Sequence, residues 1–174
     1  PVGALRKARW HSFEAAGRDA ARAGALVAFG QPLEVRYDFT GADVVVTLDA
    51  DPFAFGPGHV RYARDFARRR RASVEEGGPP VRLYAIESSP TCTGTLADHR
   101  VSLPARELPA AAAALAAELG VAGLPRPTGL DPTRARWIPA AAADVKKAGD
   151  RALIVPGEFA PPAVHALAHA LNQA

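Results

Sequence analysis

Residues 42–65, ADVVVTLDADPFAFGPGHVRYARD, decide the fold class of this chain. The stretch begins with a run of apolar, mostly β-branched residues and leads into two carboxylates, Asp49 and Asp51. A loop containing Gly56 and Gly58 follows, and apolar residues then recur at helical spacing. A buried strand that leads through a loop into a helix is the repeating unit of nucleotide-binding α/β domains. The stretch therefore predicts a domain of that class.

Strand and helix patterns alternate along the rest of the chain. Besides the strand at 42–49, strands are predicted at 34–39, 83–87, 100–103 and 152–155. Helices are predicted at 10–23 (ended by Gly24, with a short further turn open at 25–29), 58–71, 104–119 (starting after Pro109), 140–148 and from 161 or 162 to 171. Such alternation favours a mainly parallel sheet with right-handed crossovers. We therefore expect a single three-layer, Rossmann-like α/β domain over residues 1–174.

The composition is that of an ordinary globular protein, with 48% apolar and 22% charged residues among 174. The chain contains no Met and begins with Pro, so we expect it to be a fragment of a longer polypeptide. Its single cysteine, Cys92, excludes an internal disulfide and any iron–sulfur site built from cysteines of this stretch. No apolar run reaches the roughly 20 residues that a membrane-spanning helix needs.

The net charge of +3 is small, and much of the positive charge lies in the arginine run at 68–71. One interpretation of this run is a solvated helix C-terminus, where the helix dipole favours cations. The other is a surface for an acidic or phosphate-bearing partner. Nucleic-acid binding is not predicted, because the sequence lacks basic residues spread over a face with interleaved aromatics.

Polar residues gather where the predicted strands end. Ligands of parallel sheets bind at the carboxyl ends of the strands, where the loops after 42–49, 83–87 and 152–155 meet. The first loop offers carboxylates for ribose hydroxyls and a helix N-terminus for an anion, and the second offers hydroxyl donors. The candidate cofactor-binding residues are Asp49, Asp51, Gly56, Gly58, Ser88, Ser89 and Thr91.

Two features of the first loop argue against a bound nucleotide. It lacks the glycine fingerprints of dinucleotide-binding and P-loop sites. Asp49 and Asp51 would also repel a phosphate placed close to them. Two interpretations of this loop therefore remain: it is a purely structural turn, or it contacts a ligand.

Other residue combinations give no complete catalytic or metal site. His165 and His169 share a helix face at the spacing of zinc ligands, but no third ligand is evident nearby. We predict that they are polar residues flanking the buried face of the last helix. Ser88, Asp98 and His99 contain the residue types of a catalytic triad, but nothing places Ser88 on a nucleophile elbow. No catalytic residue and no metal ligand is therefore assigned.

Four segments together resemble a known family. They are Trp10-His11 with the basic residues and glycine of 18–24, then 42–70 (ADVVVTLDADPFAFGPGHVRYARDFARRR), 82–100 (RLYAIESSPTCTGTLADHR) and 164–172 (VHALAHALN). They resemble the molybdopterin oxidoreductase-like, iron–sulfur subunit of alternative complex III and its relatives. The resemblance covers most of the chain, in order.

The resemblance implies a Rossmann-like domain of the formate dehydrogenase and dimethyl-sulfoxide reductase class. In active members, loops like 49–58 and 88–95 help to hold a molybdopterin guanine dinucleotide. In the alternative complex III branch this site is generally thought to carry no molybdenum, and electrons pass through iron–sulfur clusters elsewhere in the chain. The resemblance also implies a parent on the periplasmic face of a bacterial cytoplasmic membrane. Its partners would be other domains and subunits of a quinol-oxidising complex, with no direct membrane insertion of this stretch.

Three functions are weighed on this basis. A non-catalytic scaffold domain of the oxidoreductase subunit predicts a strand-end cleft filled by its own side chains, with Phe53 and Phe55 as plugs. A retained dinucleotide site predicts an open cleft lined by donors. A small hydrolase or transferase predicts a carboxylate–hydroxyl cluster at Asp49, Asp51 and Ser88.

Overall fold

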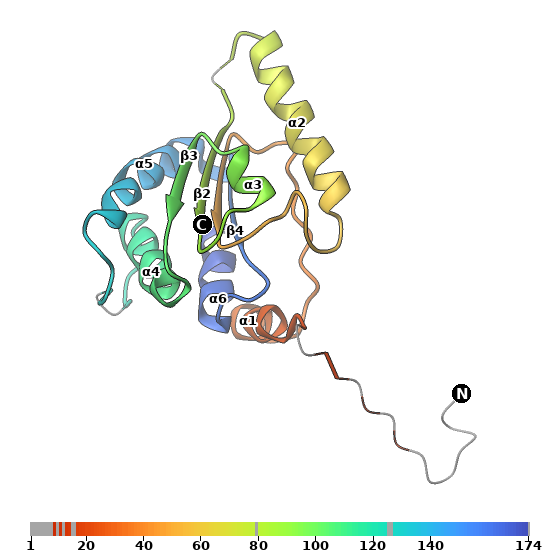
Figure 1. Ribbon diagram of the computed structural model, residues 1–174, viewed down its shortest axis with the longest axis vertical. Coiled ribbons are helices and arrows are strands. Elements are labelled where there is room, and N and C mark those ends of the chain that lie inside the picture. The colour runs from red at the N-terminus through yellow and green to blue at the C-terminus, as the bar shows by residue number, and fades with distance from the viewer. Residues whose placement is uncertain are drawn as a thin grey trace.

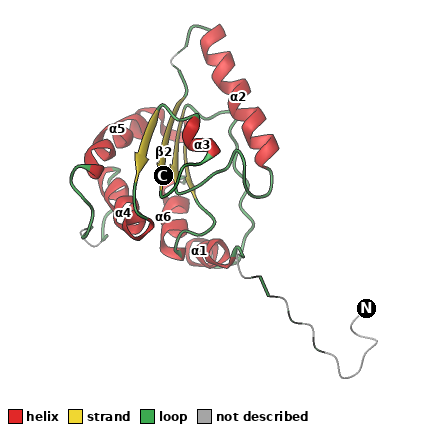
Figure 2. Ribbon diagram, viewed as in Figure 1, coloured by secondary structure: helices red, strands yellow, loops and turns green. Residues whose placement is uncertain are grey.

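The computed structural model of the chain describes residues 9, 11, 13, 14, 17–78, 80–124 and 127–173. Helices flank both faces of a β-sheet in this part of the chain (Figure 1, Figure 2). The strands are β1 (Val44–Leu48), β2 (Arg82–Glu87), β3 (His99–Ser102) and β4 (Ala152–Pro156). The α-helices are α1 (Asp19–Phe29), α2 (His59–Glu75), α3 (Cys92–Thr95), α4 (Leu108–Glu118), α5 (Ile138–Ala148) and α6 (Pro162–Leu171). Short 3-10 turns cover Ala105–Glu107, Arg134–Trp137 and Gly149–Arg151.

The sheet has four parallel strands in the spatial order β3-β2-β1-β4. β1 pairs with β2 on one side and with β4 on the other, so that Val44 lies opposite both Arg82 and Ala152. All five residues of β1 are buried, as expected of a central strand covered on both faces. The predicted three-layer, Rossmann-like α/β architecture is confirmed.

Alternate residues of β1 face the two cores of the domain. Val44, Val46 and Leu48 pack against α4, α5 and α6 on one face of the sheet. Val45 faces the other side, where α2 and the chain before and after β1 contribute aromatic rings: Phe39, Phe53, Tyr62 and Phe66. Each fully buried apolar side chain contributes about 1.5–3 kcal/mol. The two cores together hold the strand ends, and hence the loops after them, in place.

The later helices follow the predicted pattern. α4, α5 and α6 each carry proline in the first turn, where the missing amide hydrogen costs no helical hydrogen bond. α2 continues to Glu75, beyond the predicted end at residue 71. Among the described residues, no helix combines the length and apolar character needed to cross a membrane.

The first helix lies later in the chain than predicted. α1 ends at Phe29 and is capped by the left-handed Gly30, so it runs through Gly24 and includes the further turn at 25–29. The predicted start at Trp10 lies outside the described residues, and residues 9, 11, 13, 14 and 17 are not helical. Gly24 lies within α1 at the point where this helix crosses α6. Glycine is needed there because a Cβ at position 24 would lie 2.3 Å from the Cβ of His165. The glycine marks a close helix crossing instead of a helix end.

No strand forms at 34–39, all of which the structure describes, so this prediction is wrong. The free edge of β1 is taken by β4 instead. The alternating pattern has another cause, because Tyr37 and Phe39 turn their rings toward Tyr62 of α2, at 6.1 and 5.2 Å between centroids. Alternate burial at 34–39 therefore comes from side chains that pack against α2, without hydrogen bonding to a neighbouring strand.

α6 is buried on two sides, which corrects the prediction for its histidines. The predicted apolar residues join or border the core: Val164, Leu167, Ala168 and Leu171. His165 and His169 were expected to be flanking polar residues, but they are only 3% and 6% exposed. α1 covers them, and the ring of His169 lies 5.0 Å from that of Phe29.

Candidate functional site

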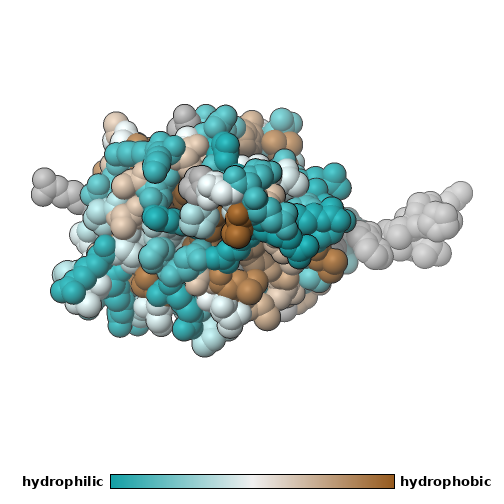
Figure 3. Space-filling model, turned by 90° about the horizontal axis from the view of Figure 1, so that it is seen from above, coloured by the Kyte–Doolittle hydropathy of each residue, from teal (hydrophilic) through white to brown (hydrophobic). Residues whose placement is uncertain are grey.

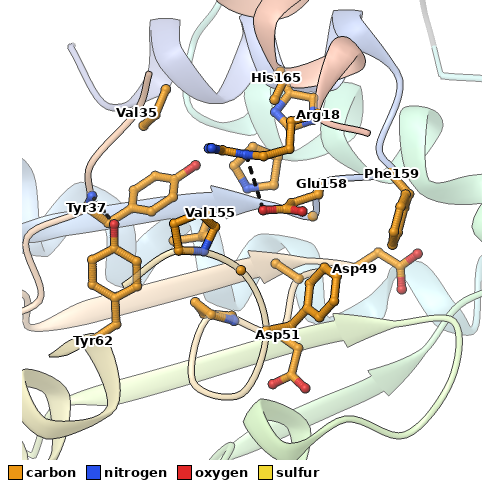
Figure 4. Close-up of a pocket in the computed structure, with 18 of the residues that line it drawn as sticks. Arg18, Val35, Tyr37, Asp49, Asp51, Tyr62, Val155, Glu158, Phe159 and His165 are labelled. Atoms are coloured by element: carbon orange, nitrogen blue, oxygen red, sulfur yellow. Dashed lines mark hydrogen bonds and ion pairs between the residues drawn. The ribbon is translucent and has the colours of Figure 1, made fainter. Parts of the chain in front are cut away.

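A cavity lies at the carboxyl end of the sheet, between the loops that follow β1 and β4. Strand order reverses there, because the chain steps from β1 through β2 to β3 and then returns to the other side of β1. Such a reversal leaves a crevice in which open α/β sheets bind ligands. The cavity has a volume of about 340 Å³ and is also walled by α1, by the segment after it and by His165 (Figure 4).

Most of the candidate cofactor-binding residues line this cavity. Those that do are Asp49, Asp51, Gly56, Ser88, Ser89 and Thr91. Gly58 does not line it, and instead precedes α2 in the left-handed conformation, where its carbonyl accepts the amide hydrogen of Tyr62. The strand-end loops therefore meet as predicted.

Hydrogen bonds of Asp49 connect the loop after β1 to the loop after β2. Its Oδ1 accepts hydrogen bonds from the backbone amide of Ser88 at 2.7 Å and from the Ser88 hydroxyl at 2.9 Å. The residue has a φ of 57°, a conformation that aspartate tolerates better than most residues. Its carbonyl oxygen lies against Gly157, where a Cβ would be only 1.9 Å away. The loops after β1 and β4 therefore cross so closely that position 157 requires glycine.

Asp51 forms a second set of hydrogen bonds between the same two loops. Its Oδ1 accepts from the hydroxyl of Thr93 at 2.6 Å and from the Thr93 amide at 2.9 Å. Its Oδ2 accepts from the amide of Cys92 at 3.3 Å. These amides begin α3, so the carboxylate satisfies donors that a helix start leaves unpaired. Both aspartates thus have oxygens occupied by the protein's own donors.

A third strand-end carboxylate, Glu87, is one that the sequence pattern does not single out. It is 2% exposed, accepts from the hydroxyl of Thr91 at 2.6 Å and forms an ion pair with Arg100. Gly94 leaves room for it, since a Cβ there would lie 2.2 Å from a carboxylate oxygen. The hydroxyl of Thr91 therefore donates its hydrogen to Glu87 and not to a ligand. Gly94 is the residue from which the sequence could have indicated a buried side chain nearby.

The opposite wall of the cavity carries charges that sequence reasoning missed. Nη1 of Arg18 pairs with Glu34 at 2.6 Å, and Nε of Arg18 lies 3.4 Å from Oε1 of Glu158 (Figure 4). Beside them, the hydroxyl of Tyr62 accepts the backbone amide hydrogen of Tyr37 at 3.2 Å. Burial and the neighbouring Tyr62 raise the pKa of the Tyr37 phenol well above its ordinary value. These residues are distant in the chain, and no local motif joins them.

His165 adds a neutral imidazole to the cavity wall. Burial and the nearby His169 lower the pKa of His165 to about 4. Burial also lowers the pKa of His169. Both Nε2 atoms are buried without a hydrogen-bond partner in the described part of the chain. His165 therefore brings no positive charge to the cavity at neutral pH.

The two phenylalanines predicted to plug the strand-end cleft do not fill it. Phe53 belongs to the core, where its ring stacks on Phe66 at 4.8 Å. Phe55 is 55% exposed at the cavity wall, and its ring lies 6.1 Å from that of Phe159, which is also exposed. The prediction of a cleft plugged by these residues is wrong.

Ser88, Asp98 and His99 do not assemble into a triad. His99 begins β3 and stacks on Tyr84, its partner across the sheet, at 4.7 Å. Ser88 lies beyond the end of β2, about 13 Å further along the strand direction than Tyr84. Asp98 accepts the amide hydrogen of Leu83 at 2.8 Å. Among the described residues, no group of three or more His, Cys, Asp and Glu side chains is placed to hold a metal ion.

Carboxylates outnumber guanidinium groups around the cavity. Its charged lining residues are Glu34, Asp49, Asp51, Glu158, Arg18 and Arg22. A pyrophosphate would meet net repulsion here, and the amides at the start of α3 already bind Asp51. Exposed rings at Phe55 and Phe159, beside carboxylate acceptors, suit a planar ring that carries N–H donors. The volume lies at the lower end of the roughly 300–1,000 Å³ of ligand sites, which leaves room for one nucleoside-sized group.

No family model matches this chain, and no curated protein matches it.

Proposed function

We propose that this chain is a non-catalytic scaffold domain of a molybdopterin oxidoreductase-like, iron–sulfur subunit in a membrane-associated, quinol-oxidising complex. The motif resemblance supports the family and the parent protein. Phe53 and Phe55 do not plug the cleft as a scaffold domain was expected to show, so the scaffold role rests on the loop donors instead. The hydrogen bonds of Asp49 and Asp51 are the observation that carries it. In a working dinucleotide site these loops would present their donors to the ligand. Here the donors of Ser88 and Thr93 are bound to the protein's own carboxylates.

The strength of these bonds favours a rigid, structural loop cluster. A hydrogen bond to a charged carboxylate contributes about 1.5–3 kcal/mol, roughly twice a neutral one. A ligand that competed for the same amides and hydroxyls would have to replace several such bonds at once. The loops are therefore better suited to holding one shape against neighbouring domains than to opening around a cofactor.

The proposal also gives the domain a place in its parent. The iron–sulfur clusters lie elsewhere in the parent chain, because Cys92 is the single cysteine here. The domain contacts other domains and subunits on the periplasmic face of a bacterial cytoplasmic membrane. This location follows from the motif resemblance alone.

A retained cofactor site is the second candidate, and the cavity where strand order reverses favours it. The residues present do not fit the whole of a molybdopterin guanine dinucleotide, because carboxylates dominate the wall that a pyrophosphate would face. They fit a single nucleobase-like ring near Phe55 and Phe159, with Glu158 as an acceptor.

Metal analysis of the parent protein, purified natively from membranes, separates the two candidates. The scaffold proposal expects iron and acid-labile sulfide, co-purification with other subunits, and no molybdenum. Stoichiometric molybdenum with a pterin would favour the second candidate and sink the first. A parent without iron that does not associate with membranes would refute the oxidoreductase assignment itself.

A further inference from the structure

α2 presents an apolar face that the described part of the chain leaves exposed. Figure 1 shows α2 at the side of the molecule, with its C-terminal half extending past the sheet. Alternating spacings of three and four residues separate Val60, Ala63, Ala67, Arg70 and Val74 along this helix. This is the spacing by which one helix packs against another. Val60 and Val74 are 71% and 69% exposed.

A groove of about 440 Å³ runs beside this face. Phe53 and Phe66 line it from the core side, and Leu96, which is 51% exposed, lines it from the segment after α3. On α2 the groove is lined by the small side chains of Ala63 and Ala67, which allow a second backbone to approach closely. Figure 3, which views the molecule from above, shows apolar groups gathered in places on an otherwise hydrophilic face. The groove is therefore shaped to receive large apolar side chains.

Arg70 lines the groove while its charge is bound elsewhere. Its guanidinium donates to the carbonyl of Leu96 at 2.9 Å and forms an ion pair with Asp98. It also lies 5.6 Å from the centre of the Phe66 ring. These contacts join α2 to the segment after α3, and they leave the methylene groups of Arg70 as part of an apolar wall.

Another arginine of α2, Arg71, also lines the groove. Arg64, by contrast, is already paired with Asp65 of the same helix, at 3.0 Å. Arg68 and Arg71 are exposed and form no ion pair within the described residues. Arg69, in contrast, points back into the domain and pairs with an aspartate before β1. The arginine run thus divides into residues that hold the domain together and residues that face outward.

We infer that α2 docks an acidic amphipathic helix of a partner protein. Large apolar residues of that helix would fill the groove, and Asp or Glu beside them would pair with Arg71 at the groove and with Arg68 one turn away. A membrane surface fits less well, because interfacial helices insert large side chains and the centre of this face carries Ala63 and Ala67. The inference rests on the proposed scaffold role of the domain and adds the chemistry of what it holds.

A labelled model helix tests this inference on the purified protein. The probe is a fluorescein-labelled peptide of about 18 residues, close to the length of α2, with Leu at the a and d positions and Glu at e and g. Fluorescence anisotropy should show binding that weakens as salt is added. Val74→Glu, which places a carboxylate in the groove, and Arg71→Glu, which reverses the rim charge, should each weaken binding at least about tenfold.

Matched controls separate the groove from general surface effects. Val27 is 73% exposed on α1, so Val27→Glu makes the same chemical change away from the groove. Arg36→Glu makes the matching charge reversal at an exposed loop residue. Both should bind within about twofold of the unchanged protein. A second peptide with Lys in place of Glu should not bind the unchanged protein and should gain binding to Arg71→Glu, where the charges become complementary.

Three results would overturn the inference. They are failure to bind the acidic peptide, equal binding by Val74→Glu, and binding to anionic phospholipid vesicles without peptide binding. If Val74→Glu did not fold, as judged by circular dichroism, Arg71→Glu would decide alone, because it alters only an exposed side chain. Molybdenum in the parent would refute the scaffold role, and peptide binding would then need an explanation other than that role. A molybdenum-free, iron-containing parent that binds no peptide would refute the docking site alone.

Discussion

Asp51→Ala should destabilise the protein although it removes no side chain from the core. The Asp51 carboxylate accepts hydrogen bonds from the Thr93 hydroxyl at 2.6 Å, from the Thr93 amide at 2.9 Å and from the Cys92 amide at 3.3 Å. Each bond to a charged group contributes about 1.5–3 kcal/mol. Thr93 is fully buried, so water replaces the lost acceptor only in part. We expect the free energy of unfolding to fall by about 3 kcal/mol, which lowers Tm by roughly 6–12 °C for a chain of this size.

Urea unfolding followed by tryptophan fluorescence measures this loss, because Trp137 is buried in the core and its emission changes on unfolding. Asp51→Asn keeps one oxygen that can accept from Thr93, so it should cost about 1 kcal/mol. Asp19→Ala is the control, since the Asp19 side chain is 91% exposed and its removal should change stability by less than about 0.5 kcal/mol. If Asp51→Ala unfolded at the same urea concentration as the unchanged protein, Asp51 would have no structural role and the reasoning would fail.

Three further substitutions test other parts of the structure. Gly157→Ala should cost more than about 3 kcal/mol in urea unfolding, because its Cβ would meet the backbone oxygen of Asp49, whereas Gly41→Ala, with open space around it, should be nearly neutral. Burial, and secondly the nearby His169, lower the pKa of His165 from 6.5 in the unfolded chain to about 4 in the folded protein. The folded state therefore favours the neutral imidazole, so the protein is fully stable above pH 6.5 and loses stability as the pH falls toward 4. Unfolding free energy should therefore drop by about 2 kcal/mol from pH 7.5 to pH 5, and His165→Gln should flatten that profile; an unchanged profile would show that His165 is not buried neutral. Asn172→Asp should lower Tm by a few degrees, about 1 kcal/mol, because Asn172 both donates to the carbonyl of Ile154 and accepts from its amide at 2.8 Å; no change would mean that these bonds do not support β4.

The fold was predictable because burial leaves a pattern within one segment. β1 reads as a buried strand from five consecutive residues, and the structure buries all of them. The same rule failed at 34–39, where alternate burial of Tyr37 and Phe39 against α2 imitates a paired strand. It also failed at α1, because Gly24 serves a crossing with α6 and only the folded protein shows that crossing. The local sequence pattern therefore predicts which residues are buried, but it does not predict which element buries them.

The strand-end loops were predictable as a group, but their contacts were not. The parallel sheet brings the carboxyl ends together, so Asp49, Asp51 and Ser88 were expected near one another. Asp51 and Thr93 are 42 residues apart, and nothing local indicates that the carboxylate binds the start of α3. The Arg18–Glu158 contact spans almost the whole chain and depends on β4 returning beside β1. Strand order decides these pairs, and residue types alone do not specify it.

Native mass spectrometry of the parent protein tests most directly whether the strand-end site is structural. If the site is structural, the mass should equal that of the polypeptide with its iron–sulfur clusters, with no additional mass of a nucleotide or pterin dinucleotide. The result that would contradict it is a bound dinucleotide at one per chain whose occupancy falls in Asp49→Ala and Asp51→Ala while Asp19→Ala retains it.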